Sequence, residues 1–226
     1  MLKTFRYTSV TSTMDVARDL LKEIKAPFLV VADYQTAGRG RNSSHWQSLP
    51  EAFLGTFVFE GTHLVKPRIS LIFALEVLRL LDLSPQKAQV KWPNDLLETS
   101  TEKKFGGILI ELLENYLLIG LGLNLYGNQA FGGVLNLRND LDKQLLTTIF
   151  ADGFDNFLCT AENFQDLPLK FDAYNYLKNK QIKFNNSEQV HLALGITDEG
   201  GLIVKNQSGE QQVIFSAFSV QVCHGQ

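Results

Sequence analysis

Two glycines and two arginines alternate in Gly38-Arg39-Gly40-Arg41, shortly after an apolar run that ends at Ala32. Glycine lets the main chain approach a bound ligand closely, and the forked guanidinium of arginine suits a carboxylate or phosphate. Open-sheet proteins tend to bind ligands just beyond the ends of buried strands. The segment therefore indicates an anion site, although a solvated loop or a weak nucleic-acid tract has the same composition.

A second group with ligand-binding chemistry is Lys91-Trp92-Pro93-Asn94-Asp95. Its composition is that of a turn. The Asn94 amide offers a paired donor and acceptor for the edge of a purine, and the Asp95 carboxylate offers a ligand for Mg²⁺ beside phosphates. The residue types leave both interpretations open, a plain turn and a ligand site.

Two glycine-containing segments follow that have the character of strands. Lys104 precedes Phe105-Gly106-Gly107-Ile108-Leu109, where a lysine either guards a sheet edge or directs its charge at an anion. The segment Gly120-Leu121-Gly122-Leu123-Asn124 lacks the third glycine, opening a helix, that a dinucleotide-binding motif requires. Strands that line a pocket fit this second segment better.

Other kinds of site find no support in the sequence. The four histidines lie in unrelated segments, and Cys159 and Cys223 are the only cysteines. This pattern argues against a zinc site and against a disulfide framework. A Walker sequence and a Gly-x-Ser-x-Gly motif are both absent, so a P-loop and a hydrolase elbow are unsupported.

The composition bounds the class of protein. The 226 residues are 45% hydrophobic and 20% charged, with a formal net charge of −3, which is typical of a globular protein and excludes intrinsic disorder. The slightly acidic balance argues against a dedicated nucleic-acid binder. Because no apolar run reaches the roughly 18 residues of a membrane span and the N-terminus lacks the apolar core of a signal peptide, we expect a cytoplasmic protein that needs no membrane partner.

The elements that must position these residues follow from apolar periodicity and turn residues. The pattern predicts an α+β domain followed by a small all-β appendage. Helices are predicted for 13–25, from Pro67 onward, for 141–164 and for 169–177; strands for 28–32, 53–59, 90–92, 105–113 and 116–125; a surface loop for 127–139; and short strands from 182 to 222.

The four segments, in this order and preceded by Ser12-Thr13, resemble the biotin protein ligase family over the whole chain. The resemblance implies a mixed sheet with flanking helices, of the class II aminoacyl-tRNA-synthetase-like type, over residues 1–179. It implies a small SH3-like β-barrel over residues 180–226, since 194–204 is similar to that part of the family.

The resemblance also implies a reaction in two steps. The biotin carboxylate attacks the α-phosphate of ATP, with Mg²⁺ present, and gives biotinyl-5′-AMP and pyrophosphate. A lysine of the biotin carboxyl carrier protein of acetyl-CoA carboxylase, or of a related carboxylase, then takes the biotinyl group. The residue types agree with this chemistry, because a carboxylate that approaches a triphosphate needs fixed cations.

Site residues carry over from the family by position. Lys104 and Arg39 are the implied catalytic residues, Lys104 lying between the biotin carboxylate and the α-phosphate. The implied biotin contacts are Ser12, Thr13, Met14, Gln35, Gly38, Arg39, Gly40, Arg41, Lys104, Gly106 and Gly107. The implied ATP or adenylate contacts are Arg39, Arg41, Trp46, Asn94, Asp95, Lys104 and Asn124, with Trp46 near the adenine, Asn94 reading its edge, and Asp95 serving either the metal or the acceptor amine.

Two departures and two rival functions accompany the resemblance. Met14 stands where the family commonly has Asn or Gln, and 42–45 carries none of the further glycine or basic residues that family loops often have. The catalytic pattern starts at Ser12, which leaves no room before it for the DNA-binding module of some members, so we expect a monofunctional ligase. The rivals are a lipoate or octanoate ligase and a non-catalytic biotin-binding protein; both a monomer and a homodimer occur in the family.

Overall fold

The computed structural model describes residues 1–47, 49–61, 66–125, 142–185, 187–217 and 219–223. Its larger sheet has seven strands in the order β1-β2-β3-β7-β6-β5-β4, parallel between β1 and β2 and antiparallel elsewhere. The strands are β1 (Lys3–Val10), β2 (Phe28–Gln35), β3 (Ala52–Glu60), β4 (Ala88–Lys91), β5 (Asp95–Glu98), β6 (Lys104–Leu113) and β7 (Tyr116–Asn124).

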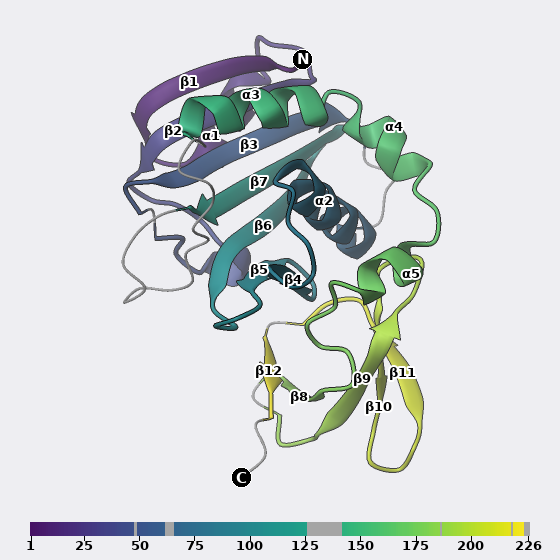
Figure 1. Ribbon diagram of the computed structural model, residues 1–226. Coiled ribbons are helices and arrows are strands. Elements are labelled where there is room, and N and C mark those ends of the chain that lie inside the picture. The colour runs from purple at the N-terminus through teal and green to yellow at the C-terminus, as the bar shows by residue number, and fades with distance from the viewer. Residues whose placement is uncertain (48, 62–65, 126–141, 186, 218, 224–226) are drawn as a thin grey trace.

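A second sheet follows in sequence. It is antiparallel, in the order β11-β10-β9-β8-β12, and Figure 1 shows it beside the end of the first sheet that carries β4 and β5. Its strands are β8 (Gln181–Phe184), β9 (His191–Ile196), β10 (Leu202–Lys205), β11 (Gln211–Ile214) and β12 (Val220–Val222). The helices are α1 (Thr13–Leu20), α2 (Lys66–Leu80), α3 (Lys143–Gly153), α4 (Phe157–Glu162) and α5 (Leu167–Asp172), with a short 3₁₀ turn at Arg41–Ser43.

Helices cover both faces of the larger sheet, which explains the unbroken apolar run of β2. Leu29 and Val31 belong to the main core under α2, α3 and α4, whereas Phe28 and Val30 pack in a smaller core under α1. Successive residues of a strand point to opposite faces, so a strand buried on both sides is apolar throughout. Phenylalanines fill the main core, and the ring of Phe73 stacks on that of Phe154 at 4.2 Å between centroids.

The predicted fold class is confirmed: a mixed sheet with flanking helices precedes a second, C-terminal sheet. The predicted helix 13–25 is too long, because α1 ends at Leu20 and its C-cap is Leu21. The apolar pattern continues because Leu21 and Ile24, in the turn that follows, pack against the same small core. The predicted loop 127–139 lies wholly outside the described residues, and the division of the chain at residue 180 stays a prediction.

Other element predictions need correction. The predicted helix 141–164 is two helices, α3 and α4, and the predicted helix 169–177 begins earlier, at Leu167, and ends at Asp172. Strands β1 and β5 have no counterpart in the prediction. Strand β1 is an edge strand with only partial burial of alternate residues, so its apolar signal is weak, and β5 is four residues long. Within the described chain, no helix combines the length and apolar character needed to cross a membrane.

Two side chains, Trp92 and Arg68, contact the connection between β9 and β10 of the second sheet. The Trp92 indole Nε1 donates a hydrogen bond of 2.9 Å to the carbonyl of Gly200, and Arg68 at the start of α2 donates to the carbonyls of Phe164 and Asp198. Trp92 is 1% exposed. The tryptophan of the predicted turn 91–95 therefore fixes that turn against the β9–β10 connection and does not face a ligand.

We expect Gly200→Ala to destabilise this joint. Gly200 has φ +82°, and a Cβ there would lie 2.5 Å from the backbone nitrogen of Arg68. Gly209 is a matched control, because its φ is +88° and no atom lies within 4 Å of an added Cβ. Both variants carry the backbone strain of an alanine at positive φ. Only Gly200→Ala adds a steric clash, which we expect to lower the free energy of unfolding by about a further 1–3 kcal/mol. Urea unfolding measures the difference; equal losses of stability would show that the contact with Arg68 is not close.

Candidate active site

A cavity of about 270 Å³ lies between the first turn of α1, the strands β3, β6 and β7, and residues 39–46. It lies on the face of the sheet that α1 covers. Most of the residues that the sequence predicts for the site line it: Ser12, Thr13, Met14, Gln35, Arg39, Gly40, Arg41, Trp46, Asn94, Asp95, Lys104 and Gly107. Segments far apart in the sequence therefore form one site.

Neutral polar groups occupy the part of the cavity at α1. Gln35 Oε1 accepts hydrogen bonds from the Thr13 backbone nitrogen at 2.8 Å and from Thr13 Oγ1 at 3.1 Å. Thr56 Oγ1 donates to Thr13 Oγ1 at 2.8 Å, and Ser12 caps α1 by accepting from the Met14 nitrogen. All four polar side chains are buried. A network of this kind fixes donors and acceptors for a neutral polar ligand group.

Glycines form the floor of the cavity. Gly107 pairs with Gly122 and Leu109 with Gly120 across β6 and β7. A Cβ at Gly122 would lie 2.5 Å from Trp46 Cε2, and one at Gly120 would lie 3.1 Å from Met14 Sδ. The absence of side chains at these positions makes room for the indole of Trp46, whose buried Nε1 has no hydrogen-bond partner in the described chain.

Charged groups gather at the other end of the cavity. The polar network lies opposite Gly120 of β7, through Thr56, whereas Asp95 pairs with Gly107, which pairs with Gly122. Lys104 Nζ lies 2.7 Å from Asp95 Oδ1 and 5.6 Å from the centre of the Trp46 ring. Arg41 donates to Asn94 Oδ1 at 3.1 Å and to the carbonyl of Ala217 at 2.9 Å. Burial lowers the pKa of Arg41 from its ordinary value, and the charge of Asp95 partly opposes this shift. Arginine stays a cation under such conditions.

Asn94 connects β6 to Arg41. Its amide nitrogen donates to the carbonyl of Ile108 at 3.0 Å, and its Oδ1 accepts from Arg41. Each end of the amide makes one hydrogen bond, so Asn94 holds Arg41 against β6; its predicted contact with a purine edge stays a prediction. Lys91 is absent from the lining; burial lowers its pKa, Asp95 opposes that shift, and Lys104 and Lys180 add to it.

Arg39 is held by two carboxylates. Its Nη2 lies 2.8 Å from Asp15 Oδ1, in the first turn of α1, and 3.9 Å from Glu111 Oε1 on β6. Arg18 pairs with the same two carboxylates. In this arrangement Arg39 has its charge balanced by the protein, whereas the sequence predicts a cation directed at substrate anions.

Gly38, Gly106 and Asn124 lie outside the lining. A Cβ at Gly38 would meet the Trp46 carbonyl oxygen at 2.7 Å, and one at Gly106 would meet Leu123 Cδ2 at 2.6 Å. Gly106 thus faces the main core and permits close packing there. Asn124 is buried at the end of β7, and its Oδ1 has no partner among the described residues.

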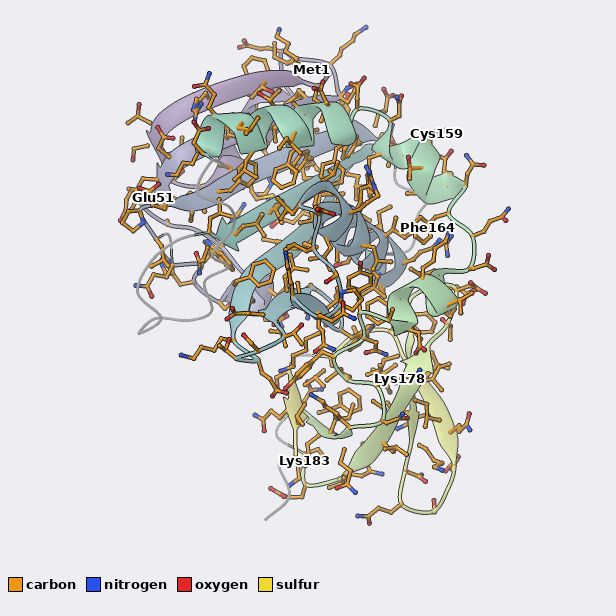
Figure 2. The ribbon with its side chains drawn as sticks, viewed as in Figure 1. Met1, Glu51, Cys159, Phe164, Lys178 and Lys183 are labelled. Carbon is orange, nitrogen blue, oxygen red and sulfur yellow. The ribbon has the colours of Figure 1, made fainter. Side chains whose placement is uncertain are left out.

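The sequence analysis did not identify Thr56, Asp15 or Glu111 as part of the site or its support. Thr56 had a usable signal, a polar residue within an apolar strand. Asp15 and Glu111 gave no signal in the sequence, because Arg39, which both contact, comes from a distant segment. Cys159 and Cys223 are free thiols, and Figure 2 places Cys159 on α4, away from the sheet face with the cavity.

The cavity therefore has a buried neutral hydrogen-bonding part, a glycine floor beneath an aromatic ring, and an edge with the cations Lys104 and Arg41. Asp95 is the only carboxylate among the described lining residues. No group of three His, Cys, Asp or Glu side chains in the described chain could hold a metal by itself. One carboxylate together with substrate phosphates is a common way to bind Mg²⁺, so the lining fits Mg²⁺ that arrives with a nucleotide.

The chain is similar to known proteins in sequence and in fold. A family model described as "Biotin/lipoate A/B protein ligase family" matches residues 4–124. The bifunctional ligase/repressor BirA of Bacillus spizizenii is 28% identical over 90% of this chain and 70% of its own length. BirA of Escherichia coli is 33% identical over 56% of this chain and 42% of its own length. A solved structure, the biotin protein ligase from Aquifex aeolicus in complex with biotin and ATP, has a TM-score of 0.78 and 22% identity, over 99% of this chain and 100% of that one.

Proposed function

Because the chain belongs to the biotin/lipoate A/B protein ligase family, we propose that it activates biotin with ATP and transfers the biotinyl group to a carrier lysine. The observation that carries the proposal is the cavity, which joins a buried neutral polar network to a cationic edge over a glycine floor. Biotin has the matching parts, a neutral ureido ring at one end and a carboxylate at the other. The carrier of acetyl-CoA carboxylase, or of a related carboxylase, is the acceptor that the sequence resemblance implies.

In the proposed first step a biotin carboxylate oxygen attacks the α-phosphorus of ATP. The bond from that phosphorus to the bridging oxygen breaks, and pyrophosphate leaves with the electron pair. Both reactants are anions, so Lys104 and Arg41 supply the positive charge that the approach needs. No proton has to move in this step, and positioning dominates catalysis. Mg²⁺ bound by Asp95 and the phosphates would add positive charge at the same place.

We propose that the neutral network orients the ureido ring. Thr13 and Gln35 fix each other's hydrogen-bonding direction, and Thr56 fixes Thr13. The apolar part of the cavity at Leu109 and Gly120 then takes the valeryl chain, which places the carboxylate toward Lys104. Met14 reaches the floor through its thioether, 3.1 Å from the Cβ position of Gly120, so it supplies apolar contact where family members commonly have an amide.

In the proposed second step the acceptor amine attacks the acyl carbon of biotinyl-5′-AMP, an amide bond forms, and AMP leaves. The amine must lose a proton, and Asp95 is the carboxylate that the described lining offers. Its ion pair with Lys104 at 2.7 Å is compatible with this role and with the metal role.

We propose residues 1–179 as the catalytic domain, and residues 180–226 as a domain that reaches the site through the contact of Ala217 with Arg41.

A direct experiment tests the proposal. The protein is incubated with ATP, Mg²⁺, a biotin carrier domain or a lipoyl carrier domain, and either biotin or lipoate, and the carriers are weighed by mass spectrometry. We expect a biotinyl adduct on the biotin carrier and no lipoyl adduct. Modification by lipoate alone would replace the proposal by its rival in the same family. Binding of biotin without pyrophosphate release would point to a non-catalytic binding protein.

A further inference from the structure

The segment from Gly38 to Trp46 is folded back on itself beside the cavity. The Trp46 nitrogen donates to the Gly38 carbonyl at 2.9 Å, and the Gly40 nitrogen donates to the Ser44 carbonyl at 2.7 Å. Arg39 and His45 form an antiparallel bridge between the two arms. We call residues 38–46 the arginine segment. Because it is braced internally, what holds it to the rest of the protein is the set of contacts that its side chains make.

The two arginines of this segment bind different parts of the molecule. Arg41 reaches the turn between β4 and β5 at Asn94 and the second sheet at Ala217. Arg39 reaches Asp15 on α1 and Glu111 on β6. The segment is thus attached on one side through hydrogen bonds from Arg41 to neutral acceptors, and on the other side through ion pairs of Arg39.

The ion-pair side is a closed group of four charges. Arg18 and Arg39 face Asp15 and Glu111, each acid lies near both bases, and the formal charges cancel. The four side chains are between 25% and 39% exposed, so water screens them less than it screens a surface pair. Arg39 Nε and Nη2 are buried and make no hydrogen bond in the described chain. The charges of Asp15 and Glu111 therefore hold this guanidinium in place.

We propose that Asp15 and Glu111 are positioning residues that anchor Arg39, and through it hold the arginine segment closed over the acyl adenylate. The inference rests on the proposed function and deepens it. It assigns Arg39 to retention of the intermediate and leaves Lys104 and Arg41 to neutralise the reacting anions. An acyl adenylate that leaves the site acylates amines without selection, so an anchor on the covering segment governs selectivity more than rate.

The test uses Glu111→Gln and Asp15→Asn, alone and together, in the full chain. With biotin and ATP and no carrier, we expect the fraction of biotinyl-5′-AMP found free in solution to rise about fivefold, as for loss of one partly buried ion pair. Pyrophosphate release in a single turnover should change less than about twofold. Asp19→Asn is the matched control, since Asp19 lies on the same helix and pairs only with exposed Lys22 among the interactions described.

Coupling to Arg39 separates anchoring from a general structural effect. In an Arg39→Ala background, Glu111→Gln should add no further release of adenylate, because the pair is already broken. Additive effects would overturn the proposal. An equal loss of pyrophosphate release and adenylate retention would also overturn it, since Arg39 would then act on the reacting anions.

A readout without substrate keeps this test separate from the proposed function. Trypsin cleaves after Arg39 and Arg41, which remain present in Glu111→Gln and Asp15→Asn. We expect cleavage within the arginine segment to be about fivefold faster in these variants than in wild type or Asp19→Asn. Unchanged cleavage would refute the anchor even if the wild type makes biotinyl-5′-AMP. Faster cleavage in a protein that makes none would refute only the proposed function.

Discussion

Lys104→Ala is expected to lower pyrophosphate release from biotin and ATP by at least about a hundredfold, the usual scale for loss of one preorganised charged group. Lys104 Nζ lies 2.7 Å from Asp95 Oδ1. Its removal takes away a cation and also leaves the Asp95 carboxylate unbalanced, beside two anionic reactants. The fold should be little affected, because Lys104 is 42% exposed. The measurement is single-turnover pyrophosphate release at saturating biotin and ATP.

Three further variants separate the causes of that loss. Lys104→Arg retains a cation and should recover part of the rate. Lys104→Ala combined with Asp95→Asn removes the unbalanced carboxylate, so any rate that it recovers measures the harm done by Asp95 alone. Lys87→Ala, at an exposed position outside the lining, should behave as wild type. A rate within a few fold of wild type for Lys104→Ala would remove this lysine from the first step.

Gly122→Ala is expected to raise the KM for biotin and ATP about tenfold, since overpacking typically costs 1–3 kcal/mol and 1.4 kcal/mol is a factor of ten. The new Cβ would lie 2.5 Å from Trp46 Cε2 and Cζ2, so the indole must leave its place on the glycine floor. Trp46 belongs to the arginine segment and not to a strand, so its displacement leaves the pairing of β6 with β7 in place. We therefore expect the loss in ligand binding to exceed the loss in stability.

Tryptophan fluorescence checks the cause of this effect. The chain has two tryptophans, and Trp92 is 1% exposed with its Nε1 hydrogen-bonded, so a red shift of the emission in Gly122→Ala reports on Trp46. Gly195→Ala is the matched control, because no atom lies within 4 Å of its Cβ position. An unchanged KM together with unchanged emission would mean that the indole does not rest on Gly122.

The parts of the site that could be predicted from the sequence depend on local geometry. The turn Trp92-Pro93-Asn94 joins β4 to β5, and the neighbouring strand β6 begins at Lys104, so Asp95 and Lys104 meet through short connections. Ser12 caps α1 as its residue type suggests. The glycines and arginines of 38–41 were recognisable because few other segments combine backbone freedom with forked cations.

The parts of the site that could not be predicted from the sequence depend on strand register and on contacts between distant segments. Gly106 and Gly107 are neighbours of the same type, yet one faces the core and the other faces the cavity, because successive strand residues point to opposite faces. The pairing of β6 with β7, which places Gly106 opposite Leu123 and Gly107 opposite Gly122, sets which one does so. The partners of Arg39 come from α1 and β6, and residue types alone did not identify them among the acidic residues of the chain.

The turn between β4 and β5 touches both sheets, and this has a thermodynamic consequence. Trp92 binds the Gly200 carbonyl of the second sheet, and two residues later Asn94 holds Arg41, which itself donates to the Ala217 carbonyl. A ligand that orders Arg41 therefore also favours the docked position of the C-terminal strands. Such coupling is reciprocal. If a ligand of the cavity changes the affinity of the second sheet for a partner, that partner changes the affinity of the cavity for the ligand by the same factor.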